Sequence, residues 1–450
     1  MNDRSAILNA IEAEKDRILA AERWIWKHPE TGYKEWKTHA YLKEQYESLG
    51  YTLTEFGNIP GFYTDLDTGR PGPTFAIFGE LDSLIVPTHP ECDPATGAVH
   101  ACGHNCQSAA LLGVAIGLKA PGALDGLCGR IRLIAVPAEE LLELEYRQTL
   151  KDKGIIRFFG GKQELMARGI LDDVDLSMMI HTGSGNGYSC GIGSNGCMIK
   201  QYIFKGLSAH AGGSPHNGIN ALYAANVALN AANALRETFK DSDHVRFHPI
   251  ITAGGSAVNA IPDYVTIESY VRAATMEAIE KYNEKINRAF AAAAASIGCE
   301  LVIKDQHGYA PRLNDPEMLY FMKTVAEEIL PADQVKSSGD FGTGCSDMGD
   351  VSTVMPALHP AIGGYSGHGH GNDLYITDPY LATVVSAKIQ ALGAVRFLEN
   401  DAAEVKKVLA QKQVVYQSIP EYLEAVERLT FTGETVRYEE DGSISLKYKP

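Results

Sequence analysis

The sequence has little of what marks a secreted, membrane-spanning or nucleic-acid-binding protein. Eight cysteines in 450 residues are too few for a disulfide framework. No stretch reaches the roughly 18 uninterrupted apolar residues that a transmembrane helix needs, and residues 1–15 lack the apolar centre of a signal peptide. Basic residues are outnumbered, since 40 Lys and Arg against 56 Asp and Glu give a formal net charge of −16. We therefore expect a cytoplasmic protein that binds a small-molecule substrate and neither nucleic acid nor membrane.

Short apolar runs alternate with helical patterns in the first part of the chain. Residues 74–78, 131–136 and 176–180 are short, mostly apolar runs, as in buried strands. Strands that alternate with helices predict an α/β fold with a mixed, mostly parallel sheet and helices on both faces. In such sheets the active site lies beyond the carboxyl ends of the strands.

The pattern changes after a Gly- and Ser-rich stretch at residues 183–196. Two strand-helix-strand units follow, with a long Ala-rich helix over residues 276–297, and they predict a compact α/β sandwich. We therefore expect a discontinuous catalytic domain, residues 1–195 and 312–450, with a second domain inserted at residues 196–311. A terminal hairpin is expected at residues 435–448.

Two short segments carry most of the chemical signal. In His100-Ala101-Cys102-Gly103-His104-Asn105, a thiol and an imidazole lie two residues apart, just before an expected helix. Thiolate and imidazole are typical zinc ligands, although an isolated Cys is more often a small buried apolar group. A nucleophilic Cys102 is the alternative, but such a thiol has no use for the acidic pair described next.

The second segment is Glu139-Glu140, which follows the apolar run 131–136. Two adjacent acids near a buried strand are costly to desolvate unless a cation or a reaction needs them; a solvated helix cap is the alternative. Neighbouring side chains at a turn point in different directions. We therefore assign Glu140 as a metal ligand and Glu139 as the general acid/base that handles the proton of a metal-activated water.

Other candidates complete a ligand set. His181 follows the apolar run 176–180, and His368 and His370 lie in a Gly-rich loop, where spacing alone does not decide between the two. Asp82, at a turn after another buried strand, is expected to bridge the ions or to orient a ligand. His210 lies in a loop of the expected inserted domain.

These segments, in this order, resemble the co-catalytic metal-dependent aminoacylase/carboxypeptidase superfamily. The branch that they look most like is that of the amidohydrolases, which includes hippurate hydrolase, indole-acetyl-amino-acid hydrolase and aminobenzoyl-glutamate hydrolase. The resemblance covers about residues 20–400. The matching stretches are residues 28–33, 79–84, 100–105, 137–140, 206–211, 254–262 with Arg272, and 346–352.

The resemblance implies two divalent metal ions per subunit, zinc or manganese with cobalt or nickel as alternatives. The implied ligands are Cys102, which would bridge the ions, together with His104, Glu140, His181 and His370. His370 is preferred to His368 because of its spacing to the residues that follow.

The resemblance also assigns roles to the inserted domain. That domain would make a homodimer, or a larger assembly. Within it, His210 would stabilise the oxyanion in a partner's site, while Asn259 and Arg272 would contact the substrate. Arg272 is suited to a carboxylate.

We therefore expect a metal-dependent amidohydrolase of the aminoacylase or metallopeptidase type. Its substrate would be an N-acyl amino acid, an aminobenzoyl-glutamate-like compound or a dipeptide. The alternatives are the same chemistry on another C–N bond, as in an aminohydrolase that deaminates an aromatic amine, and a non-catalytic metal-binding homologue. Two departures concern specificity: residues 105–107 read Asn-Cys-Gln where many members have Asp and a further His, and residues 141–159 are longer than usual. This longer segment is expected to form a pocket wall or an interface.

Overall fold

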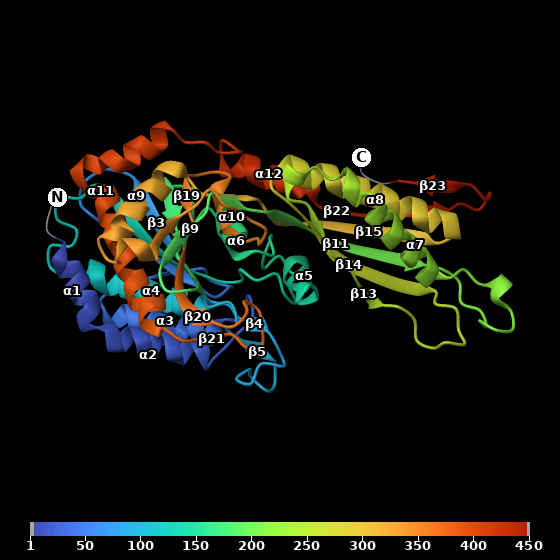
Figure 1. Cartoon of the computed structure of the whole chain (residues 1–450), viewed down its shortest axis with the longest axis horizontal. Helices are drawn as coiled ribbons and strands as arrows, with labels where there is room; N and C mark the ends of the chain where they lie inside the picture. The colour runs from blue at the N-terminus through green and yellow to red at the C-terminus, as the bar shows by residue number, and fades with distance from the viewer. Residues whose placement is uncertain (1–3, 448–450) are drawn as a thin grey trace. The chain divides into compact units, whose positions relative to one another are not determined.

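The chain divides into two compact units (Figure 1). The structure, a computed structural model, describes residues 4–447, so the outermost residues of the predicted catalytic domain and the Tyr448 end of the predicted hairpin lie outside it. Unit 1 comprises the chain up to Gly193, Leu313–Phe341 and Ser346–Ile419. Unit 2 comprises Ser194–Arg312, Gly342–Cys345 and the chain from Pro420 onward.

Unit 1 is built on a six-stranded sheet with the order β1-β2-β6-β3-β7-β19. Strands β6, β3, β7 and β19 run parallel, whereas β1 and β2 are antiparallel additions at one edge. Strand β3 is buried along its whole length, which explains its continuous apolar run. The strand bounds are β1 Thr54–Glu55, β2 Phe62–Asp67, β3 Thr74–Glu80, β6 Arg130–Val136, β7 Leu176–Met178 and β19 Ala357–Leu358.

The core helix of unit 1 is α4 (His104–Leu118), in which every residue is buried. It packs on β3 and against helices α1, α2, α3 and α11, while α9 packs on β19 and α11. The fold class predicted from the sequence, a mostly parallel mixed α/β sheet with an inserted domain, is confirmed. The other helices are α1 Ser5–Ala13, α2 Lys15–Trp26, α3 Trp36–Ser48, α5 Leu144–Asp152, α6 Gly161–Ala167, α9 Pro316–Glu327, α10 Met348–Ser352 and α11 Ser386–Ala410.

A second sheet of unit 1 brings distant segments together. Its order is β17-β9-β20-β21, and β8 pairs in parallel with β20. The pairing places His181, at the start of β8, beside the strand that leads into the His-Gly-His loop. The other strands of unit 1 are β4 Leu84–Ile85, β5 Ala98–Val99, β8 His181–Ser184, β9 Tyr188–Cys190, β17 Val335–Ser337, β20 Ala361–Ser366 and β21 Tyr375–Ile376. Three two-residue strands, β10 Gly193–Ser194, β16 Arg312–Leu313 and β18 Phe341–Gly342, have one residue in each unit.

One helical stretch, Tyr380–Ala410, is long and apolar enough to cross a membrane, with a mean hydropathy of 1.4 in its best window. However, 94% of that window is buried inside the structure. Burial of this kind is what the central helix of a folded core shows, so the composition of this stretch is explained by packing.

Unit 2 is a two-layer sandwich. Its sheet has the order β12-β14-β11-β15-β22-β23, with β13 also paired to β14, and every pairing is antiparallel. Helices α7 and α8 pack against each other and on β11 and β14. The bounds are β11 Gly196–Lys205, α7 Ala221–Ala234, β12 Arg246–Phe247, β13 Ile250–Ala253, β14 Tyr264–Ala273, α8 Met276–Ile297, β15 Glu300–Tyr309, α12 Ile419–Leu429, β22 Phe431–Tyr438 and β23 Ile444–Leu446.

The domain borders differ from the predicted ones at the end of the chain. The prediction assigned residues 312–450 to the catalytic domain, but the chain from Pro420 onward clusters with unit 2. The physical reason is strand pairing, because β22 adds to the edge of β15, with Leu301 opposite Val436. The short stretch Gly342–Cys345 also belongs to unit 2.

Candidate metal centre

The site lies where several chain segments of unit 1 end or turn. Strand β3 ends at Glu80, helix α4 begins at His104 and strand β8 begins at His181. Gly103 precedes α4 with a φ of 93°, and a Cβ at this position would lie 2.9 Å from Cβ of Thr182. Glycine is therefore required where the Cys102–His104 turn approaches β8.

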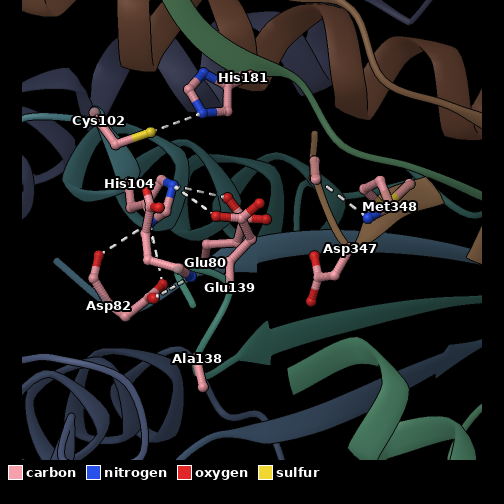
Figure 2. A network of polar contacts seen from close by, with 12 residues as sticks. Glu80, Asp82, Cys102, His104, Ala138, Glu139, His181, Asp347 and Met348 are labelled. Carbon is pink, nitrogen blue, oxygen red and sulfur yellow. Dashed lines mark hydrogen bonds and ion pairs between the residues drawn. The ribbon is translucent and has the colours of Figure 1, made fainter. Parts of the chain in front are cut away.

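Cys102, His104 and His181 form the first group of candidate ligands, with ligand atoms all within 4.8 Å of one another. The Cys102 thiol points at the His181 ring, with Sγ 3.4 Å from Nε2 (Figure 2). Two atoms bound to one ion by bonds of about 2.0–2.3 Å at tetrahedral angles lie roughly 3.3–3.7 Å apart. The separation therefore fits a shared divalent ion.

Hydrogen bonds fix which ring nitrogen of each histidine faces the group. Nδ1 of His104 lies 3.0 Å from the Asp82 carbonyl oxygen and 3.1 Å from its Oδ1, and Nδ1 of His181 lies 2.6 Å from the Thr182 carbonyl oxygen. Each Nδ1 therefore carries the proton and donates it, which leaves Nε2 to accept a metal ion. Asp82 is fully buried and orients His104.

Cys102, Glu140 and His370 form the second group. Nε2 of His370 lies 3.3 Å from Oε1 of Glu140, and the backbone N–H of His370 donates to the Ala101 carbonyl at 2.8 Å. His368 instead pairs with Asp373 at 2.8 Å, and its side chain is 89% exposed. The structure thus brings His370 and not His368 to Cys102.

Glu80, His104 and Glu139 form a third group. Oε2 of Glu80 and Oε2 of Glu139 lie 3.2 Å and 3.9 Å from Nε2 of His104 (Figure 2). A ring nitrogen has one lone pair, so this group competes with the first one for His104. Lys162 already places an ammonium 2.5 Å from Oε1 of Glu80, which disfavours a further cation there.

The charges of the cluster call for cations. Burial, and then Glu80 and Glu140, raise the pKa of Glu139 well above its usual value, and burial also raises the pKa of Glu140 and of the Cys102 thiol. In the absence of cations these shifts favour the neutral forms of the three groups, whereas bound divalent ions favour their ionised forms. Nε2 of His104 and Oε1 of Glu140 are buried and make no hydrogen bond within residues 4–447. A donor set of thiolate, imidazole and carboxylate fits zinc-like ions.

Sequence reasoning missed Glu80, Lys162, Asp347 and Glu35 as supporting residues of this site. Lys162 donates to Glu80 and to Asp347, both at 2.5 Å, and all three side chains are buried. Glu80 and Asp347 lie in motifs that carried the family resemblance, and Glu35 lies two residues after the motif at residues 28–33. An acid in or near such a motif without an assigned role was therefore the available signal.

The predicted residues of the inserted domain lie in unit 2, whereas the cluster lies in unit 1. His210 and Ala260 form an isolated antiparallel bridge, and the Ala211 N–H donates to the Asn259 carbonyl at 2.9 Å, so His210 and Asn259 are neighbours. Arg272 lies apart from them in β14 and donates to the Thr343 carbonyl at 3.4 Å.

The fold and this cluster define a class, that of the metal-dependent hydrolases acting on amide or peptide bonds. Residues 62–392 match the model of peptidase family M20/M25/M40, and the chain belongs to this family. The match confirms the resemblance found in the sequence and the expectation of a hydrolase.

Named relatives fit this family. The chain is 28% identical over 370 residues to the Xaa-Arg dipeptidase of Mus musculus, covering 78% of this chain and 77% of that one. It is 28% identical over 286 residues to one of the subunits of the p-aminobenzoyl-glutamate hydrolase of Escherichia coli, covering 62% of this chain and 55% of that one.

A solved structure of a dinuclear metal-binding peptidase of the M20 family from Bacillus subtilis is 20% identical. Its TM-score is 0.65, and the match covers 86% of this chain and 99% of that one. At this identity the likeness shows a shared fold.

Proposed function

We propose that this protein cleaves the amide bond of an N-acyl amino acid, an aminobenzoyl-glutamate-like compound or a dipeptide, with Glu139 as the general acid/base. One observation carries the proposal. The Glu139 carboxylate lies 3.9 Å from His104 Nε2 but belongs to neither of the two ligand groups that share Cys102. A carboxylate beside a metal pair, and outside its ligand set, is suited to proton transfer.

The ligand set supports two divalent ions, with Cys102 shared and His104, His181, Glu140 and His370 completing the two groups. Zinc or manganese suits these donors, with cobalt or nickel as alternatives. When bound, the ions would supply Lewis-acid activation of water and of the amide carbonyl. Glu139 takes the proton of the attacking water and returns it to the leaving nitrogen, so that the amine departs neutral.

Unit 2 supplies the remaining proposed contacts. His210 stabilises the oxyanion, and Asn259 and Arg272 bind the substrate, Arg272 through a carboxylate. Support for a carboxylate comes from the relatives, because the names of a dipeptidase and of an aminobenzoyl-glutamate hydrolase describe substrates that carry one.

The test combines a substrate panel with Glu139→Gln. The panel contains N-acyl amino acids, dipeptides, aminobenzoyl-glutamate and aromatic amines, so that deamination is detected if it occurs. We expect Glu139→Gln to keep its metal, measured by elemental analysis, and to lose about 10²- to 10⁴-fold in kcat. Glu44→Gln, an exposed residue of α3, is the matched control. A Glu139→Gln variant with full metal content and full activity would contradict the assignment of Glu139 as the general acid/base.

We also propose a homodimer formed through unit 2. Within residues 4–447, strand β13 pairs only with β14, and it exposes Ile250 and Ile251, at 63% and 44%. An exposed apolar edge strand is a template for pairing with a second copy. Light scattering should give twice the chain mass, and Ile250→Lys should give a monomer; a monomeric wild-type protein contradicts the proposal.

We also propose a cytoplasmic location, because eight cysteines in 450 residues are too few for a disulfide framework.

A further inference from the structure

The turn that carries Glu139 has an unusual backbone conformation. Ala138, which follows Pro137 after β6, has a φ of 59° and is fully buried. Residues with a Cβ seldom adopt this left-handed conformation, because the Cβ crowds the neighbouring carbonyl oxygen. Such a conformation persists only where the surroundings hold it in place.

Both peptide groups of Ala138 are held by hydrogen bonds. Its N–H donates to Oε1 of Glu35 at 2.7 Å, and its carbonyl accepts the Gly161 N–H at 3.0 Å. On the other side of Glu139, the Glu140 N–H donates to Oδ2 of Asp82 at 2.8 Å. The amides before and after Glu139 are thus each bonded to a buried carboxyl group from a distant segment.

Glu35 is itself rigidly placed. It lies immediately before α3, has no exposed surface, and its carbonyl accepts the His39 N–H at 2.8 Å. The same loop is fastened by Glu30, whose carboxylate accepts the Thr38 N–H at 2.9 Å and whose carbonyl accepts the Ser83 N–H at 2.8 Å. The acceptor for Ala138 is therefore preorganised before any substrate arrives.

We infer that Glu35 is a positioning residue that fixes the left-handed Ala138 turn and thereby aims the Glu139 carboxylate. The inference rests on the proposed role of Glu139. Glu35 contributes as a hydrogen-bond acceptor, since its Oε1 takes the Ala138 N–H. Burial, and then Asp82, raise the pKa of Glu35 well above the usual value, which favours the neutral form of the carboxyl group. An amide of the same size can replace it.

The experiment compares four variants with the wild type: Glu35→Gln, Glu35→Met, Ala138→Gly, and the Glu35→Met/Ala138→Gly double variant. Gln retains an acceptor and should keep kcat within about threefold. Met removes the acceptor and should lower kcat about 10- to 100-fold with little change in KM, as expected for a misplaced catalytic group. Glycine adopts a positive φ without strain, so the double variant should regain at least about fivefold of the lost kcat, while Ala138→Gly alone stays near wild type.

A readout independent of activity separates this inference from the proposed function. Peptide-level amide hydrogen exchange over residues 136–141 should be slow in the wild type and in Glu35→Gln, and faster in Glu35→Met, while exchange elsewhere and the metal content remain unchanged. If Glu139→Gln is fully active, the proposed function fails, and exchange alone decides the role of Glu35. Equal protection in Glu35→Met, or a Glu35→Gln variant as impaired as Glu35→Met, would overturn the inference.

Discussion

Lys162 is a lysine without solvent exposure that holds two buried acids in unit 1. Its ammonium bonds Glu80 and Asp347, and its own backbone N–H donates to Asp347 at 3.0 Å. Burial alone would lower the pKa of Lys162. The negative charges of Asp347 and Glu80 raise it by more, so the pKa of Lys162 lies above its usual value and the lysine stays charged. Lys162 therefore supplies the acidic cluster with a positive charge that does not depend on bound ions.

Replacing Lys162 by Met should destabilise the metal-free protein by about 3–5 kcal/mol, because two buried carboxylates lose their partner charge. Urea unfolding measures this change. The triple variant Lys162→Met/Glu80→Gln/Asp347→Asn is the control, and it should recover most of the loss, since no unpaired charge is left. If Lys162→Met unfolds at the same urea concentration as the wild type, the ion pairs of Lys162 with Glu80 and Asp347 contribute little to stability.

At the scale of elements, Glu12 links helix α1 to another helix of unit 1. Glu12 accepts hydrogen bonds from Lys388 and from the Tyr380 hydroxyl, both at 2.7 Å, so α1 is tied to the Tyr380–Ala410 helix. These bonds, with a further one from Lys15, lower the pKa of Glu12 from 4.5 to about 2.

A pH dependence follows from that shift. Because the folded pKa lies below the unfolded one, the contribution of Glu12 is complete above pH 4.5 and is lost as the pH falls toward 2. It amounts to at most about 1 kcal/mol, since the Glu12 side chain is 38% exposed. Glu12→Gln should therefore unfold at a lower temperature than wild type at pH 7 and approach it as the medium is acidified. Glu14→Gln is the control. If the difference in unfolding temperature between Glu12→Gln and the wild type does not narrow at low pH, the argument is contradicted.

The long segment after the Glu pair shows where sequence reasoning ends at this scale. The sequence shows that residues 141–159 form a longer segment than usual. The structure shows that this segment contains a helix, α5, which is anchored by Arg147. Arg147 is buried and donates to the Phe159 carbonyl at 2.7 Å and to the Glu140 carbonyl. Periodicity identifies a helix, whereas a contact between a buried arginine and single carbonyl oxygens is set by packing.

At the scale of the whole molecule, the order of the motifs was enough to predict the family, and the alternation of apolar runs with helical patterns was enough to predict the α/β class. The ligand segments could be placed because strand ends of a parallel sheet meet at one edge. The residues that support the ligands could not be predicted, because their partners are far away in the sequence. Lys162 bonds Glu80 and Asp347, 82 and 185 residues away, and Glu35 bonds Ala138, 103 residues away. Likewise, nothing local in β22 indicates that it pairs with β15, a strand far earlier in the chain.

The two units should respond differently to metal removal. All candidate ligands lie in unit 1, so a chelator should abolish activity and lower the unfolding temperature of that unit. Ions present at 100 times their Kd stabilise the folded state by about 2.7 kcal/mol, and that contribution disappears with them. Hydrogen exchange should then quicken in α4 and β8 and stay unchanged in α8 and β15. Zinc, manganese or cobalt should restore the activity and the slow exchange.

Cys102→Ser should resemble the chelated protein even with metal added. Activity that survives chelation would instead support a thiol nucleophile at Cys102.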